Sequence, residues 1–179
     1  IELATQQLIS LEHEKISIAI NLSAAHLGNN ELFQWIRDRL QGKPALARRI
    51  VFEITETAAL ENMMEVREFM SELRGLGCRF ALDDFGVGFT SFSQLRELPV
   101  DLVKIDGMFV RELTHNNQDK ALVKAITDVG HSLGKQVVAE FVETEAVYNL
   151  LIECGVDYAQ GFYIGRPAPR LPRTEQATA

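Results

Sequence analysis

The sequence predicts an α/β fold of the (β/α)8 TIM-barrel type, and two observations support this prediction. Six short runs rich in β-branched and apolar residues recur along the chain, at 16–21, 49–54, 78–84, 101–106, 136–141 and 158–164. Segments with apolar residues at helical spacing separate these runs, for example at 30–40, 61–77 and 117–135. Strands that alternate with helices form parallel sheets. No phosphate-binding glycine motif follows the first run, which disfavours a nucleotide-binding doubly wound sheet.

The first predicted strand, 16–21, shows how its side chains divide between the two faces of a sheet. Every second residue from Ile16 onward is isoleucine, while the alternate positions hold Ser17, Ala19 and Asn21. In a barrel the large aliphatic set packs against the outer helices, and the smaller set faces the crowded axis.

The number of strands and the chain length are both small for a complete barrel. Six strands do not close an eight-stranded barrel, and the 179 residues fall short of the roughly 250 that are typical. We therefore expect the sequence to begin partway through the barrel, with about two strands upstream of Ile1. Residues 1–168 are assigned to the partial barrel, and 169–179, which lack periodicity, are expected to be a disordered tail.

The composition bounds the classes of protein to which the chain can belong. A net charge of -7 and a pI of about 5.1 disfavour binding to polymeric nucleic acid, which calls for a basic face. No window has the length and apolar character of a membrane span, and the first residues lack the pattern of a secretory signal. We expect a cytoplasmic domain, or the cytoplasmic part of a larger protein. Cys78 and Cys154 are isolated, so we expect buried thiols rather than a disulfide or a zinc site.

Polar side chains gather at the carboxyl ends of the predicted strands, which form the catalytic rim of a (β/α)8 enzyme. They are Asn21, Glu53, Asp83, Asp84, Lys104, Asp106, Glu140 and Gln160. Four of the charged ones share a strand face with the apolar residue two positions earlier, namely Val51, Ala81, Leu102 and Val138. A helix cap or a solvated charge is the more common explanation for any single one of them. The whole set, on successive strands with matching parity, favours a functional site.

The acidic members of this set predict a site for metal ions. Glu53, Asp83, Asp84 and Glu140 would repel one another and take up protons unless cations compensated them. Two divalent ions would balance the charge, and oxygen ligands suit Mg²⁺ or Mn²⁺ better than zinc. One carboxylate of the aspartate pair can bridge two ions while its neighbour holds the second. Such a site suits hydrolysis of a phosphoester, with Lys104 orienting the water or neutralising a phosphate.

These residues lie in stretches that resemble the EAL domain family, the cyclic di-GMP-specific phosphodiesterases of bacteria. The stretches follow the family's order: INLS at 20–23, FEITE at 52–56, DDFGVGFTS at 83–91, VKID at 103–106, VAEFVE at 138–143 and QGFYIGRP at 160–167.

The resemblance implies a role for each matching residue. The metal-binding set would be Asn21, Glu53, Asp83, Asp84 and Glu140, with Asp83 as the bridge between two Mg²⁺ or Mn²⁺ ions. Lys104 would contact the nucleophilic water, Glu140 would share in catalysis, and Glu56 would tie down the loop after the aspartates. Substrate contacts would come from Gln160, Asp106 and Phe89.

The resemblance also implies a reaction and partners. Cyclic di-GMP would be opened to linear pGpG, the loop and helix after Asp84 would form a homodimer contact, and a sensor or GGDEF-type domain could precede the chain. The Glu-Ala-Leu motif that gives the family its name, and whose glutamate binds metal, is absent from 1–179. We expect it upstream. Two alternatives stay open: a catalytically inactive receptor for cyclic di-GMP, and an unrelated metal-dependent barrel hydrolase.

Several positions depart from the family pattern. Val87, Phe89 and Thr90 replace threonine, tyrosine and serine, and these changes are mild. Phe141 replaces the glycine that follows the metal-binding glutamate. Its side chain is expected to point away from Glu140, toward the helices, and to alter packing rather than chemistry.

Overall fold

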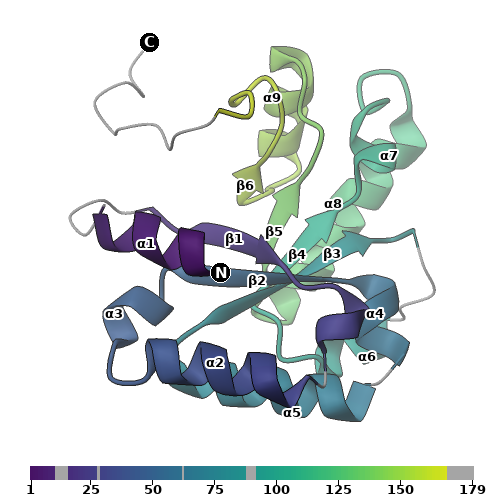
Figure 1. Cartoon of the computed structure of the whole chain (residues 1–179). Coiled ribbons are helices and arrows are strands. Elements are labelled where there is room, and N and C mark those ends of the chain that lie inside the picture. Colours follow the sequence, from purple (N-terminus) through teal and green to yellow (C-terminus); the bar gives the residue numbers. More distant parts are fainter. Residues whose placement is uncertain (11–15, 28, 62, 88–91, 169–179) are drawn as a thin grey trace.

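The computed structural model describes residues 1–10, 16–27, 29–61, 63–87 and 92–168. Its centre is a curled sheet of six parallel strands in the order β1-β2-β3-β4-β5-β6 (Figure 1). The strands are β1 (Ile18–Asn21), β2 (Ile50–Thr55), β3 (Arg79–Phe85), β4 (Leu102–Ile105), β5 (Gln136–Ala139) and β6 (Tyr158–Ala159). Each strand thus lies beside its neighbours in sequence, as in a (β/α) barrel. Within the described residues the sheet ends at β1 and β6, so it forms an open half-barrel.

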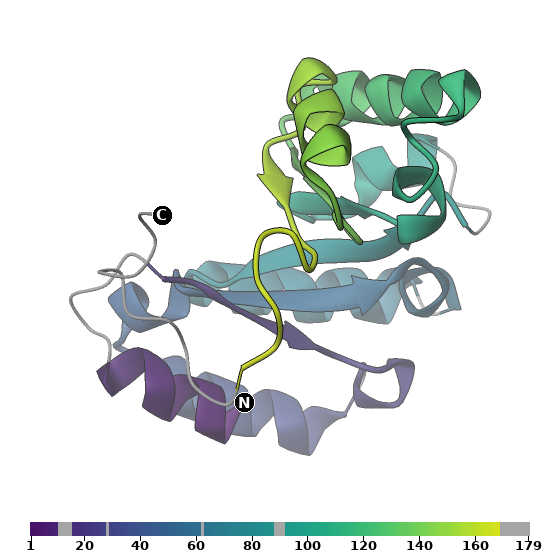
Figure 2. The same cartoon turned by 90° about the horizontal axis from the view of Figure 1, so that it is seen from above.

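The helices lie on the convex side of this sheet. Figure 2, seen from above, shows the purple and blue helices of the first half on one flank and the green helices of the second half on the other. They are α1 (Glu2–Ser10), the short 3₁₀ helix η1 (Ala24–His26), α2 (Asn30–Leu40), α3 (Pro44–Ala47), α4 (Glu56–Glu61), α5 (Met63–Leu76), α6 (Phe92–Glu97), α7 (Gly107–Val110), α8 (Asn117–Ser132) and α9 (Glu145–Glu153).

Side-chain caps explain where three of the longer helices begin. Asn29 accepts a hydrogen bond from the backbone N–H of Leu32 at the start of α2, and Asn116 accepts two at the start of α8. Thr144 accepts one from Val147 at the start of α9. Each cap satisfies N–H groups that the first turn of a helix leaves unpaired.

The two faces of the sheet carry different cores, as the alternation of side chains predicts. The convex face contributes Phe52, Phe80 and Leu82 to the main core beneath the helices. The concave face carries a second, small cluster of Val51, Ala81, Leu102 and Val138. Because these are the four apolar residues expected below the rim charges, the predicted parity is confirmed.

The last predicted strand is shorter than expected. The run 158–164 was expected to be one strand, but β6 ends at Ala159. After it the chain turns, and the carbonyl of Gly161 accepts hydrogen bonds from Ile164 and Gly165, at 3.1 and 3.0 Å. Gly161 also lies against Val142 so closely that a Cβ would approach its backbone nitrogen to 2.3 Å. The apolar residues after Ala159 therefore form a turn beside the sheet rather than a longer strand.

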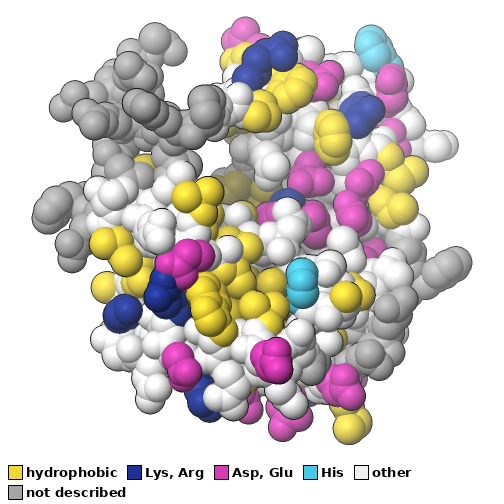
Figure 3. Space-filling model, viewed as in Figure 1, with side chains coloured by type: hydrophobic (Ala, Val, Ile, Leu, Met, Phe, Trp, Pro, Cys, Tyr) yellow, Lys and Arg dark blue, Asp and Glu magenta, His cyan; other side chains and the backbone are white. Residues whose placement is uncertain are grey.

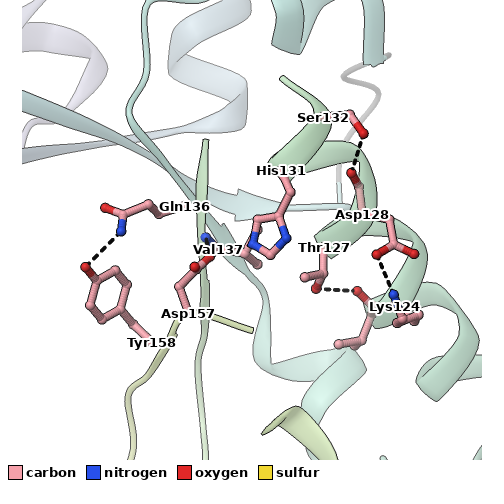
Figure 4. A network of polar contacts seen from close by, with 10 residues as sticks. Lys124, Thr127, Asp128, His131, Ser132, Gln136, Val137, Asp157 and Tyr158 are labelled. Atoms are coloured by element: carbon pink, nitrogen blue, oxygen red, sulfur yellow. Dashed lines mark hydrogen bonds and ion pairs between the residues drawn. The ribbon is translucent and has the colours of Figure 1, made fainter. Parts of the chain in front are cut away.

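A polar network closes the amino-terminal end of β5 and β6, opposite the rim (Figure 4). The carboxylate of Asp157 accepts the backbone N–H of Val137 at 2.7 Å and lies 2.8 Å from Nε2 of His131 on α8. Desolvation opposes the charge of Asp157, but these two contacts lower its pKa below the usual value. Gln136 donates to the hydroxyl of Tyr158 at 3.0 Å. The network therefore joins α8, β5 and β6 at the end of the sheet remote from the acidic rim.

The cysteines, one predicted helix, membrane spans and the tail can also be compared with the structure. Cys78 and Cys154 are buried and unpaired, as predicted, and burial raises the pKa of Cys78 to about 12. The expected helix at 61–77 corresponds to α5, preceded by the separate short helix α4. None of the described helices is long and apolar enough to cross a membrane. The expected tail at 169–179 lies outside the described residues.

Candidate active site

The rim charges converge at the carboxyl ends of β2 to β5. Figure 3 shows acidic side chains gathered around one basic side chain in a hollow of this face. Beneath the rim, the concave face encloses a hollow of about 460 Å³ whose lining includes Glu53, Lys104 and Gln160. Residues from strands distant in sequence therefore face one site, as their strand-end positions predict.

Lys104 lies at the centre of this site. Its ammonium nitrogen is 2.7 Å from Glu140, 2.9 Å from Asp83 and 3.1 Å from Glu53, measured to one oxygen of each carboxylate. The lysine side chain is 4% exposed, and the three carboxylates are 10 to 14% exposed. One buried cation on β4 thus holds together carboxylates on β2, on β3 and directly after β5.

Burial and charge act in opposite directions on the pKa of Lys104. Desolvation alone would lower it, but hydrogen bonds to Glu140 and Asp83 and the charge of Glu53 raise it above the ordinary value. For Glu140 desolvation dominates and raises the pKa, although Lys104 opposes that shift. In the metal-free fold Lys104 is therefore an ammonium at neutral pH.

The adjacent aspartates reach the same site because β3 is irregular at its end. In a regular strand, neighbouring side chains point to opposite faces. Between Leu82 and Phe85 the pairing with β4 shifts register, and Asp84 adopts φ +57°. A bulge with a left-handed residue re-aims the chain. The irregularity therefore turns both carboxylates toward the rim.

Three carboxylates are close enough to share one cation. One oxygen each from Asp83, Asp84 and Glu140 lies within 4.8 Å of the others. Burial raises the pKa of Asp84, and the charges of Asp83 and Asp106 raise it further. With Glu53 the rim carries four carboxylates against the single ammonium of Lys104, an excess of three negative charges when all are ionised. The all-oxygen donor set and this excess charge fit a hard divalent cation.

Glu56 connects the aspartate loop to the sheet. It follows β2, is 2% exposed, and its Oε2 accepts the backbone N–H of Gly86 at 3.2 Å. Gly86 comes two residues after Asp84, so this bond anchors the start of the loop that follows the aspartates. This is the role that the resemblance implies for Glu56. Phe89, one of the expected substrate contacts, lies outside the described residues.

The remaining predicted site residues lie around the rim in more exposed positions. Asn21, at the end of β1, pairs in register with Glu53 and is exposed. Asp106 caps α7, because its Oδ1 accepts the backbone N–H of Met108 at 2.7 Å. Gln160 follows β6 and borders the hollow of the concave face.

The structure adds an aromatic residue that the strand pattern did not assign to the site. Phe141 lies against α7, as expected, with Gly107 beneath its ring and the guanidinium of Arg111 stacked 4.1 Å from the ring centre. It is nevertheless 43% exposed, and its φ is +54°. The missing family glycine was the signal, since glycine adopts this backbone conformation freely and phenylalanine adopts it only at a cost in free energy.

Fold and site together define a half-barrel of parallel β/α units with a carboxylate-lined rim. The model of the EAL domain family matches residues 1–167, so the chain belongs to the EAL domain family.

Relatives and solved structures agree with this assignment. The chain is 47% identical over 159 residues to a cyclic di-GMP phosphodiesterase, PdeB, of Shewanella oneidensis, covering 89% of this chain and 19% of that protein. The structure is similar to the PaMucR phosphodiesterase in a c-di-GMP complex, with a TM-score of 0.85 and 34% identity over 98% of this chain and 70% of that one.

A second solved structure was obtained with a metal ion. It is BlrP1 of Klebsiella pneumoniae in a manganese and cyclic di-GMP complex, at 30% identity and a TM-score of 0.82, covering 92% of this chain and 42% of that one. The chain spans about a fifth of the length of the curated relative.

Proposed function

We propose that this chain is the catalytic part of a cyclic di-GMP phosphodiesterase that releases linear pGpG. The carrying observation is the cluster in which Lys104 binds three carboxylates while Asp84 extends the acidic set. The names of PdeB and PaMucR support the same substrate, because both are phosphodiesterases and PaMucR was solved with c-di-GMP.

Two divalent ions, Mg²⁺ or Mn²⁺, are the proposed cofactors. Asp83, Asp84 and Glu140 would hold them, with Asp83 as the proposed bridge, and Glu53 and Asn21 completing the protein ligands. Bound ions of this kind polarise a phosphoryl oxygen and make a water molecule nucleophilic at neutral pH. The manganese complex of BlrP1 supports this choice of metal.

Lys104 positions the water or the phosphate and stabilises negative charge. It does not abstract a proton. Its raised pKa keeps three N–H donors on a charged nitrogen, and the bonds to Glu53, Asp83 and Glu140 hold that nitrogen at the centre of the rim. An ammonium in this position can donate to a water or to a phosphate oxygen whose negative charge grows in the transition state.

The loop after β3 is proposed to link the site to a homodimer contact. Glu56 anchors its first residues through Gly86, and α6 follows it in the chain. Val87 and Phe92, on either side of the undescribed segment, are 56% and 48% exposed, and apolar side chains of this kind suit a subunit contact.

The test is hydrolysis of cyclic di-GMP by the full-length protein with Mg²⁺ or Mn²⁺, followed as linear product. Asp83→Asn should lower kcat by roughly 100-fold or more, because it removes a ligand oxygen and a charge from the site. Asp128→Asn is the matched control, since Asp128 lies on α8 with an exposed carboxylate whose described ion pair is with nearby Lys124.

The outcomes separate the open alternatives. Turnover in the wild type that Asp83→Asn abolishes supports the enzyme. Tight binding of cyclic di-GMP without turnover would instead identify a receptor. Hydrolysis of other phosphoesters with no action on cyclic di-GMP would indicate an unrelated barrel hydrolase.

A further inference from the structure

A cleft lies on the convex side of the sheet, between the helices α2 and α5. These two helices pack side by side (Figure 1), and the phenyl rings of Phe33 and Phe69 meet edge to face with 5.8 Å between their centres. The cleft has a volume of about 510 Å³, and both rings line it. Phe69 is buried, whereas Phe33 is partly exposed. The cleft therefore offers an aromatic surface that an incoming side chain can cover.

One wall of this cleft is a row of three glutamates on α5. Glu65, Glu68 and Glu72 are exposed and line the cleft. Residues three, four and seven positions apart share one face of a helix, so the row extends about 10.5 Å along α5. Like charges at these spacings repel one another and disfavour the helix. The row thus concentrates negative charge on one face of α5 at a cost in helix stability.

The arginines of α5 do not offset this charge, because they pair on the other side of the helix. A guanidinium nitrogen of Arg67 lies 3.8 Å from a carboxylate oxygen of Glu97, at the end of α6. The corresponding distance from Arg74 to Asp101, in the segment after α6, is 2.8 Å. Helix α5 therefore directs these cations toward α6 and its three carboxylates toward α2.

The arginine on the opposite wall of the cleft, Arg37 of α2, is directed toward its own helix. Its guanidinium donates to Oε1 of Gln34, and its Nε lies 3.7 Å from a carboxylate oxygen of Asp38. Its guanidinium carbon also lies 5.9 Å from the ring centre of Phe33. Among the described residues, none of the three glutamates in the row has an ion-pair partner. The charge of this wall is therefore available to an external cation.

Charge and spacing together indicate a basic α-helix as the occupant of the cleft. A helix with Lys or Arg at intervals of three and four residues presents its cations at the same rise as the glutamates. Same-face residues of an extended segment recur every 6.6 Å or so, about two residues apart, and match the row less well. An apolar side chain on the same face of the helix can cover the ring of Phe33. Anionic membranes and nucleic acids would be repelled by the row.

A second copy of this chain is a poorer partner for the cleft. The net charge of -7 means that two copies repel each other. The lysines Lys120 and Lys124 of α8 already pair with Glu153 and Asp128. A basic helix on a separate protein or domain therefore fits the cleft better.

We propose that the cleft between α2 and α5 docks a basic α-helix of a partner protein. Lys or Arg side chains of this helix pair with Glu65, Glu68 and Glu72, while an apolar side chain covers Phe33. The resulting ion pairs are solvent-exposed, so the affinity should fall as the salt concentration rises. The proposal goes beyond the phosphodiesterase reaction and does not depend on it, because the cleft lies on the convex side of the sheet.

The test uses the full-length protein and a fluorescent, alanine-based helical peptide of about 20 residues. The peptide carries lysines at intervals of three and four residues and one leucine on the same face, and its Kd is measured by fluorescence anisotropy. Combining Glu65→Gln, Glu68→Gln and Glu72→Gln should raise the Kd roughly 3- to 150-fold, as expected for three exposed ion pairs. Glutamine favours helix and removes the repulsion, so the melting temperature of this triple variant should not fall.

The matched control removes three exposed acidic charges from the other flank of the molecule. It combines Asp128→Asn on α8 with Glu145→Gln and Glu153→Gln on α9, and its Kd should stay near that of the wild type. Two altered peptides test the shape of the occupant. Replacement of the leucine by alanine should weaken binding, and so should placing the same lysines at consecutive positions, because they then point to different faces of the helix.

The outcomes separate a docking site from simpler explanations. An equal loss of affinity in the triple variant and the control would assign binding to overall charge and overturn the proposal. Equal binding of the peptide with consecutive lysines, or displacement of the helical peptide by spermine at equal concentration, would identify a general cation site and overturn the helix. A lower melting temperature of the triple variant would overturn the finding that the row is unpaired. Hydrolysis of cyclic di-GMP by the triple variant should equal that of the wild type, so failure of the docking site leaves the proposed phosphodiesterase untouched.

Discussion

Asp84 illustrates how the site trades stability for function at a single residue. Burial, followed by the like charges of Asp83 and Asp106, raises the pKa of its carboxyl group in the metal-free fold, and its left-handed φ of +57° adds backbone strain. The same conformation turns its carboxylate to the rim. Strain and repulsion of this kind are commonly concentrated at functional sites.

Replacement of Asp84 by asparagine should stabilise the metal-free protein and abolish turnover. A raised pKa means that the folded state holds its proton more tightly than the unfolded state, so ionisation at neutral pH costs stability. Asparagine removes the charge and tolerates left-handed backbone. We expect the melting temperature at pH 7 in chelator to rise by about 2 °C. The gain should shrink as the pH falls toward the usual carboxyl pKa, and an unchanged or lower melting temperature at pH 7 would contradict this account.

Replacement of Lys104 by methionine tests its role as the cation of the cluster. Three nearly buried carboxylates would lose their partner, which costs about 3–5 kcal/mol for a buried group. Because the pKa of Lys104 is raised, its contribution is complete at neutral pH and is lost only at strongly alkaline pH. The deficit of the variant should diminish in acid, where the carboxylates take up protons.

Urea denaturation in chelator at pH 7 and pH 5 measures this effect. Lys124→Met is the control, because the Lys124–Asp128 pair is about half exposed and such pairs contribute under about 1 kcal/mol. Equal losses in the two variants would show that the Lys104 cluster is not a buried charge network.

At the scale of elements, α7 shows that one residue can serve both a helix and a site. Asp106 caps this four-residue helix and also lies near enough to raise the pKa of Asp84. From the sequence, Asp106 was a candidate for a helix cap and for a substrate contact, and the structure shows the cap. The expected contact with substrate stays a prediction.

Two substitutions of Asp106 separate these roles. Asp106→Ala should destabilise the protein by about 1 kcal/mol, while Asp106→Asn should retain the cap and the stability. If the carboxylate also contacts substrate, both variants should raise KM. A KM increase in the alanine variant alone would assign the effect to the helix, and thermal denaturation with steady-state kinetics provides both readings.

At the scale of the whole molecule, part of the acid excess of the chain lies where function is proposed. The net charge is -7, and four of its carboxylates converge on one rim. A ligand that binds only the folded state stabilises it in proportion to its saturation of the site.

Mn²⁺ should therefore raise the melting temperature of the protein. At a concentration about 100 times its Kd, a single ion contributes about 2.7 kcal/mol. Sodium chloride at equal ionic strength should have no comparable effect, and Asp83→Asn should lose most of the Mn²⁺ response. A response that survives in this variant would place the ion outside the acidic rim.

Much of this architecture follows from local patterns. The runs of β-branched residues predict six strands, and the period of two places Glu53, Lys104 and Glu140 on the face that carries Val51, Leu102 and Val138. The helix over 30–40 also agrees with α2, because its cap and its apolar stripe are both local signals.

The sequence by itself therefore determined the strands, their inward faces and the charged rim, since alternation is a property of the extended backbone. The tertiary structure alone decided how both aspartates reach one site, that β6 stops at Ala159, and that Phe141 lines a cavity beside Glu140. These features break the alternation through a bulge, a turn and a left-handed residue. Each depends on contacts with a neighbouring strand or helix, and such contacts are not encoded in the local spacing of residues.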